Sequence, residues 1–113
     1  MSPRTYHHPD VDEIAIPRVL FALSDPLRLN MVRMLAEQGE TDSIDLGPDL
    51  PRSTLTHHTS LLRKSGVVHV RAEGRKCLIR LRDKDLEARF PGLIGTVLTG
   101  YGSSEEDHGE ADA

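Results

Sequence analysis

Apolar residues recur with a helical period along the first third of the chain. Between residues 12 and 23 they fall three or four positions apart, which predicts a first helix. The residues of this stripe are Ile16, Val19, Leu20 and Leu23. Asp25-Pro26 provides a cap followed by a first-turn proline, and Gly39 provides a stop, so a second helix is predicted up to Gln38. This helix has little polar surface, which favours a central position in the fold.

A further helix is predicted over 52–65, after Pro51 and before Gly66, whereas the acidic stretch 40–50 supports a short helical turn at most. At about 100° per residue, the two sides of this helix differ in character. One side holds Leu55, His58, Thr59 and Leu62, and the opposite, polar side holds Ser53, Thr56, His57, Ser60 and Lys64. We therefore expect His58 to pack against the domain and its neighbour His57 to face outwards.

The period changes from helical to alternating after Gly66. Two alternating runs separated by Glu73-Gly74 predict a two-stranded hairpin with a basic tip at Arg75-Lys76. The residues expected to face inwards are Val68, Val70, Ala72, Cys77, Ile79 and Leu81. A last helical segment follows, capped by Asp83 or Asp85 and interrupted by Pro91. Its apolar stripe consists of Leu86, Phe90, Leu93, Ile94, Val97 and Leu98.

These elements predict one mainly α domain with a small β-hairpin, as expected for 113 residues. Helix, turn, helix and then a hairpin is the order of a winged helix-turn-helix. Residues 1–11 are predicted as a flexible arm, 12–100 as the domain, and 101–113 as a disordered acidic tail. No apolar run is long enough to span a membrane and no signal peptide is recognisable, so a cytoplasmic location is expected.

Charge is distributed unevenly, which changes how the net charge of −4 is interpreted. The segment from 52 to 82 holds eight basic residues against one acid, Glu73, so it carries a net +7 within an acidic chain. The basic residues are Arg52, Arg63, Lys64, Arg71, Arg75, Lys76, Arg80 and Arg82. A local positive field attracts phosphates whatever the total charge, so this segment favours a nucleic-acid partner over a merely solvated surface.

The pair His57-His58 raises the alternative of a metal site. Metal-binding histidines on a helix commonly stand at i and i+4, because their rings then project together. Neighbouring histidines lie about 100° apart and fail this test. The polar side of the helix is instead rich in small hydroxyl and imidazole side chains that can approach base edges, and the hydroxyls of Ser53 and Thr54 can bind a phosphate. Taken alone, the helix fits a solvated surface equally well; the cationic hairpin behind it favours DNA.

Four segments, in order, resemble the ArsR/SmtB family of bacterial transcription regulators. They are ALSDPLRL from Ala22, STLTHH from Ser53 with Leu62-Arg63, SGVV from Ser65 and EGR from Glu73. The resemblance covers about residues 16–98 and implies a homodimeric winged helix-turn-helix joined by its first and last helices. Recognition helices would enter successive major grooves of a palindromic operator, with the hairpins on phosphates or the minor groove. No enzyme motif stands out, so we expect a DNA-binding transcription factor. The resemblance implies that it is a repressor, as members of the family usually are.

The resemblance and the charge pattern together assign the site residues. DNA binding is predicted for Arg52, Ser53, Thr54, Thr56, His57, Ser60 and Lys64 on the helix, and for Arg71, Arg75 and Lys76 on the hairpin. The dimer interface is predicted at Ile16, Val19, Leu20, Leu93, Ile94, Val97 and Leu98. These two stripes are more apolar surface than one small domain needs, which favours a symmetric pair of chains.

The chain departs from the family pattern in its metal sites. The cysteine pair of the thiolate sensors is missing from 41–46, and 86–98 holds none of the histidines of the other sensors. Cys77, the only cysteine, is expected to be a small buried residue. No cofactor is expected, although His7 and His8 leave weak nickel or zinc binding as an alternative. Otherwise a regulatory protein would signal through the arms, and a winged helix used only for protein contacts is a further alternative.

Overall fold

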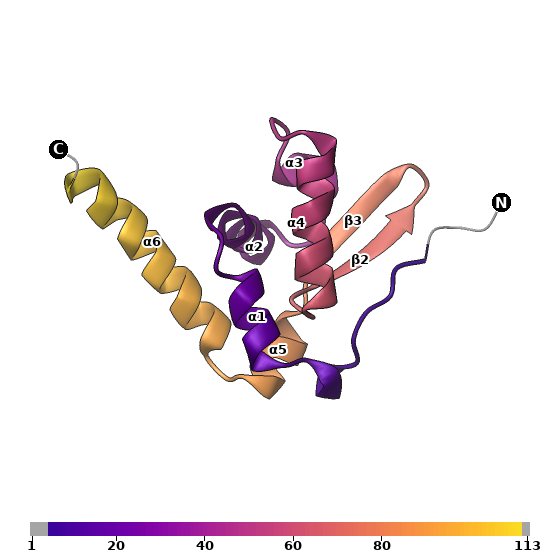
Figure 1. Cartoon of the computed structure of the whole chain (residues 1–113), viewed down its shortest axis with the longest axis horizontal. Helices are drawn as coiled ribbons and strands as arrows, with labels where there is room; N and C mark the ends of the chain where they lie inside the picture. Colours follow the sequence, from indigo (N-terminus) through magenta and orange to yellow (C-terminus); the bar gives the residue numbers. More distant parts are fainter. Residues whose placement is uncertain (1–4, 112–113) are drawn as a thin grey trace.

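The computed structural model describes residues 5–111, with side chains described as far as residue 102. The elements within this range are η1 (Val11–Glu13), α1 (Ile16–Ala22), α2 (Pro26–Gln38), β1 (Thr41–Asp42), α3 (Ser43–Leu46), α4 (Arg52–Lys64), β2 (Val68–Glu73), β3 (Lys76–Leu81), α5 (Asp83–Arg89) and α6 (Leu93–Ala111). Figure 1 shows the β2–β3 hairpin on one side of α4, and α6 projecting beyond α1 and α2 on the other. The mainly α, winged helix-turn-helix fold predicted from the sequence is confirmed.

The core lies where α1, α2 and α4 meet the inner face of the sheet. Its most deeply buried side chains include Val19, Met31, Val32, Leu62, Val68 and Ile79. The strands turn Val68 and Val70 of β2 and Ile79 and Leu81 of β3 towards this core, as their alternation predicted. Apolar contacts with α4 therefore fix the base of the hairpin.

Helix α2 begins and ends where the sequence predicts. The Asp25 carboxylate accepts hydrogen bonds from the backbone N–H groups of Leu27 at 2.9 Å and Arg28 at 3.1 Å, which satisfies two donors of the first turn. Gly39 ends the helix with a φ of 81°. Because Met31, Val32 and Leu35 are buried, the central position predicted for this helix is confirmed.

The first predicted helix is shorter than expected. The stretch 12–23 holds most of the short turn η1 and the seven-residue α1, with extended backbone between them. Pro17 lies in the first turn of α1, a position that proline favours because its missing N–H has no helical partner there. The periodicity of the apolar residues could not reveal this start, whereas the proline could have.

The sheet contains a third strand that alternation did not predict. Thr41 and Asp42 of β1 pair antiparallel with Ile79 and Leu78 of β3, which gives the order β1-β3-β2. A strand of two residues is too short to carry an alternating pattern, and α3 is the helical turn expected in this stretch. Because β3 is central, β2 is an edge strand whose outward backbone groups need other partners.

Pro91 interrupts the last helical segment as predicted, and it separates α5 from α6. The backbone of α6 continues to Ala111, through most of the stretch 101–113 that was predicted as a disordered tail. That stretch lacks proline, so no residue in it forces an end to the helix. Residues 112–113 lie outside the described residues. Within the described range no helix, α6 included, is both long and apolar enough to cross a membrane.

The predicted dimer residues fall into three groups. Ile16 and Leu20 of α1 are exposed, and so is Phe21, which the sequence analysis did not single out and which is 61% exposed. The residues on α6 are half-buried against the core; they are Leu93, Ile94, Val97 and Leu98. Val19 is wrong as an interface residue, because its side chain points into the domain and is fully buried.

Gly66 lies two residues after the end of α4, and its backbone is close to the side chain of Ile14. Its φ of 89° lies in the left-handed region that favours glycine. A Cβ on this residue would lie 2.7 Å from Cγ1 of Ile14. Ile14 is 1% exposed, so its side chain has little room to move away.

We expect Gly66→Ala to lower the free energy of unfolding by about 2–4 kcal/mol, because it adds left-handed strain and overpacks the core. Gly74→Ala is the matched control, since Gly74 also has a positive φ, 59°, but no atom lies within 4 Å of its added Cβ. The control should lose about 1 kcal/mol. Urea unfolding of both variants measures the difference, and equal losses would contradict the contact with Ile14.

Candidate nucleic-acid interface

Helix α4 turns two adjoining polar strips away from the core. The strip that faces the hairpin holds Arg52, Thr56, Ser60 and Arg63. The neighbouring strip is exposed and holds Ser53, His57 and Lys64. The opposite side is buried and holds Leu55, His58 and Leu62, as predicted. Thr59, which was predicted with them, is half-buried and lines the same groove as Thr56. Thr54, near the helix N-terminus, is half-buried.

A hydrogen bond inside the domain fixes His58. Its Nδ1 lies 3.1 Å from Nη1 of Arg28, and because a guanidinium can only donate, Nδ1 is the acceptor. The ring of His57 is exposed, 5.5 Å from that of His58 and tilted by 59°. The two histidines therefore have different surroundings, as the sequence predicted.

The hairpin of β2 and β3, called the wing below, has a cationic tip. The chain reverses at Gly74, whose φ is 59°. Arg75 and Lys76 follow it directly and both are exposed. Among the residues that the structure describes, neither forms an ion pair, so both charges are available to an external partner.

Arg71, the third cation predicted to act in the wing, is already paired within the domain. Its Nη2 and Nε donate to the two carboxylate oxygens of Glu40 at 2.8 and 3.1 Å, and Nη2 lies 3.6 Å from the Glu73 carboxylate. Hydrogen bonding by Arg71 lowers the pKa of Glu40, and that same bond raises the pKa of Arg71. The structure thus makes Arg71 a brace between the wing and the α2–β1 connection, a role that local sequence could not indicate.

Helix α4 and the wing border a single groove, called the helix–wing groove. Its lining includes Arg52, Thr56, Ser60 and Arg63 of α4 with Arg75 and Cys77 of the wing. Ile44 and Leu50 also line the groove, and Asp42 is the acid among the lining residues. Three arginines and one aspartate give the groove a positive character, and an elongated anion such as a DNA strand can touch both elements together.

Cys77 is half-buried and packs against the core, close to the small buried residue predicted. Its Sγ lies 3.7 Å from Oη of Tyr6, a residue of the N-terminal arm. Arg63 donates from Nη1 to the backbone carbonyl of His7, and its guanidinium lies 5.7 Å from the Tyr6 ring centre. Neither Arg63 nor Tyr6 was among the site residues predicted from the sequence. Arg63 follows Thr56 by two helical turns and could have been found from this spacing, whereas no local pattern places Tyr6.

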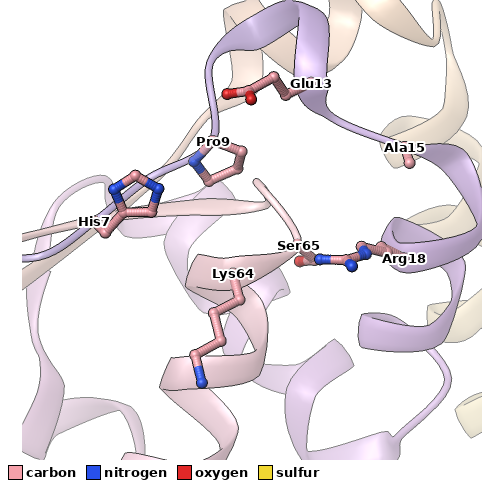
Figure 2. Close-up of a pocket in the computed structure, with 7 residues that line it drawn as sticks. All are labelled: His7, Pro9, Glu13, Ala15, Arg18, Lys64 and Ser65. Atoms are coloured by element: carbon pink, nitrogen blue, oxygen red, sulfur yellow. The ribbon is translucent and has the colours of Figure 1, made fainter.

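Lys64 lies apart from the helix–wing groove. It lines a second pocket, at the C-terminal end of α4, together with Arg18, Glu13 and Ser65. Figure 2 shows its amino group directed away from Ser65 and from the guanidinium of Arg18. The structure therefore separates Lys64 from the other cations predicted to bind DNA.

The N-terminal arm lies along the edge of the wing over its described part. Nε2 of His8 accepts a hydrogen bond of 2.9 Å from the backbone N–H of Val70, and its ring stacks on His69 with centroids 4.2 Å apart. Burial lowers the pKa of His8 to about 4, and the nearby charges of His69, Arg63 and Arg82 act in the same direction. The sequence predicted a flexible arm over 1–11; residues 5–11 lie against the domain, where the edge strand β2 offers the arm an unpaired donor. Residues 1–4 lie outside the described residues.

The histidines of the arm are not gathered into a metal site. Within the described part of the chain, no three histidines, cysteines or acids come together in a way that could hold a metal ion. His7 is exposed, and the Nε2 of His8 already accepts from Val70. Nickel or zinc binding by these two residues stays a prediction.

Solved structures with the same architecture belong to transcription regulators, whereas no protein-family model matches the chain. The transcriptional repressor BigR from Xylella fastidiosa is 30% identical with a TM-score of 0.59, over 74% of this chain and 83% of that chain. A homodimeric winged helix-turn-helix DNA-binding domain from Mycobacterium bovis, a possible ArsR-family transcriptional regulator, is 26% identical with a TM-score of 0.62. That match covers 82% of each chain.

A curated relative agrees with these structures. It is an uncharacterized HTH-type transcriptional regulator from Methanocaldococcus jannaschii, 38% identical over 55 residues. The match covers 47% of this chain and 62% of the relative, so the chain spans less than two thirds of that protein. Sequence identity to BigR over most of its length, together with the shared fold, settles the relationship. The chain belongs to the ArsR/SmtB family of winged helix-turn-helix transcriptional regulators.

Proposed function

We propose that this regulator is a sequence-specific DNA-binding repressor that binds a palindromic operator as a homodimer. The observation that carries the proposal is the helix–wing groove, which residues of the polar side of α4 and Arg75 of the wing line together, so that one duplex could contact both elements. The relative from Xylella fastidiosa is a transcriptional repressor, which supports repression over activation. The acidic residues elsewhere in the chain do not argue against DNA binding, because phosphate binding depends on the local positive charge of the groove.

Base reading falls to the exposed residues of the first half of α4. Ser53, Thr56 and His57 have short or planar side chains that fit a major groove without steric conflict. Imidazole and hydroxyl groups both donate and accept hydrogen bonds, so they can discriminate between base edges. Ser60, one turn further along the groove strip, and Thr54 complete this set.

We assign phosphate binding to three exposed cations that form no ion pair among the described residues. They are Arg52 at the start of α4 and Arg75 and Lys76 at the wing tip. Arg71 is left out of this set because it is held by Glu40, and Lys64 because it lies at the far end of the helix. Phosphate contacts fix the position of α4 on the duplex and carry no sequence information of their own.

A homodimer follows from the apolar surface on α1 and α6. Ile16, Leu20 and Phe21 are 38%, 49% and 61% exposed, which is costly for a lone domain in water. The related domain from Mycobacterium bovis is homodimeric. A two-fold axis would pair two recognition helices, and it would require an operator whose half-sites lie about one DNA turn apart.

We infer that the signal does not enter through the metal sites familiar in the family. No cysteine occurs in 41–46 and no histidine in 86–98, so neither ligand set is present. The stretch 102–113 holds five acids and no base, which supports a regulatory protein with a basic surface as the source of the signal. A winged helix used only for protein contacts would have no need of unpaired arginines around the groove.

Salt should weaken operator binding steeply. Three phosphate-binding cations in each protomer give about six contacts per dimer, so the slope of log affinity against log salt should be about −5. A mobility-shift series on fragments selected from random DNA measures both the operator and the slope. Weak, salt-insensitive binding to every duplex would instead favour the protein-interaction alternative.

His57→Ala and Arg75→Ala should fail in different ways. Loss of His57 should relax discrimination by about 1–3 kcal/mol at one base pair of each half-site, because a base contact is removed. Loss of Arg75 should weaken binding to all sequences and flatten the salt slope by about two units, one for each protomer. Lys84→Ala is the matched control, because Lys84 is an exposed cation on α5, away from the groove. Identical effects of His57→Ala and Arg75→Ala would contradict these roles.

Nickel and zinc should not bind stoichiometrically to the arm. Coordination by Nε2 of His8 would break its hydrogen bond with Val70, and the described residues offer no third ligand beside it. Calorimetric titration of each ion into the wild type and the His7→Ala/His8→Ala variant should give equal heats. A saturable heat in the wild type alone would support a metal-responsive regulator.

A further inference from the structure

Four consecutive residues of the arm, 6–9, cross from α4 to the wing. Tyr6 lies between Arg63 of α4 and Cys77 of β3. The carbonyl of His7 accepts from Arg63. The carbonyl of Pro9 accepts from Nη1 of Arg82, directly after β3, at 2.8 Å. These contacts tie together the two elements that border the helix–wing groove, and Figure 1 shows the arm running beside β2.

His8 makes two contacts with the wing, a hydrogen bond and a ring stack. Its Nε2 satisfies the Val70 N–H, which points away from β3 on the edge strand β2. Its ring lies parallel to His69, with an interplanar angle of 9°. The Nδ1 of His69 is buried without a hydrogen-bond partner, and an unsatisfied buried polar atom costs free energy. Burial, followed by nearby charges that include those of arginines, lowers the pKa of both histidines, which favours uncharged rings in the stack.

We propose that residues 6–9 form a strap that holds the wing at a fixed position relative to α4, fastened by His8 on His69 and Val70, and that operator affinity depends on this strap. The inference rests on the proposed function. His8 is a positioning residue here and contacts no base. A wing that is free to move adopts the orientation that binds DNA for only part of the time. The apparent affinity for the operator is then reduced in proportion to that fraction.

Two measurements on the full chain test the strap separately. Amide hydrogen exchange of Val70 reports whether the arm is docked, and operator binding reports what docking contributes. His8→Ala should raise the exchange rate of the Val70 amide at least about tenfold and weaken operator binding about fivefold to thirtyfold. His7→Ala is the matched control, because the exposed imidazole is lost while the carbonyl that binds Arg63 is kept. It should leave both values unchanged.

Variants of His69 provide a rescue test that simple loss of structure would not reproduce. His69→Ala removes the stacking partner and should reproduce the effects of His8→Ala. His69→Phe keeps a flat ring beneath His8 and removes the unpartnered Nδ1. It should therefore keep Val70 protected and operator affinity within about twofold of the wild type.

The outcomes separate this inference from the proposed function. Rapid exchange of Val70 in the wild type would overturn the strap. Loss of protection in His8→Ala with unchanged operator affinity would also overturn it, because docking would then contribute nothing to binding. A wild type that binds no DNA while Val70 stays protected would overturn the proposed function, and with it the role of the strap in affinity.

Discussion

A buried arginine holds the helices of this domain in register. Arg28 of α2 is 6% exposed and donates to the carbonyl of Ala22 at 2.7 Å, to that of Phe21 at 3.3 Å and to Nδ1 of His58. A buried guanidinium costs several kcal/mol of hydration unless its donors are satisfied, and here the end of α1 and one residue of α4 supply the acceptors. Rotation of α4 about its axis would take the His58 acceptor away from Nη1 of Arg28. The buried hydrogen bond between Arg28 and His58 therefore helps to fix the direction in which the polar side of α4 faces.

The position of the wing follows from that fixed helix. Leu62 on the buried side of α4 and Val68 and Ile79 of the hairpin belong to the same core, so the hairpin cannot leave the side of α4 on which it packs. Glu40 adds a second constraint, because its bidentate bond with Arg71 ties β2 to the end of α2. Core packing thus sets the side of α4 on which the base of the wing lies, while the contacts of the N-terminal arm act on β2 further along the strand. Packing does not require the arginines of the helix–wing groove.

Much of the fold could be predicted because local patterns encode burial. The cap at Asp25, the stop at Gly39 and the alternation around Gly74 each depend on residues a few positions apart. The features that were missed depend on distant partners. Glu40 and Arg71 are 31 residues apart, and His8 and Val70 are 62 apart, so no window of the sequence contains both members of either pair. The prediction that Val19 lies in the dimer interface was wrong for a related reason. An apolar stripe shows that a helix has an inner face, but it does not show whether that face packs against its own domain or against another subunit.

The same distinction applies to charge. The segment 52–82 counts eight cations, yet three of them donate to groups of the domain itself. Arg63 binds the carbonyl of His7, Arg71 binds Glu40, and Arg82 binds Asp85 at 3.0 Å. A cation that already satisfies a carboxylate or a carbonyl gains less from a phosphate, because it must give up one partner for the other. The net charge of the segment therefore overstates its attraction for DNA. What the sequence presents as one basic region is divided by the fold into cations that bind groups of the domain itself and cations that stay exposed.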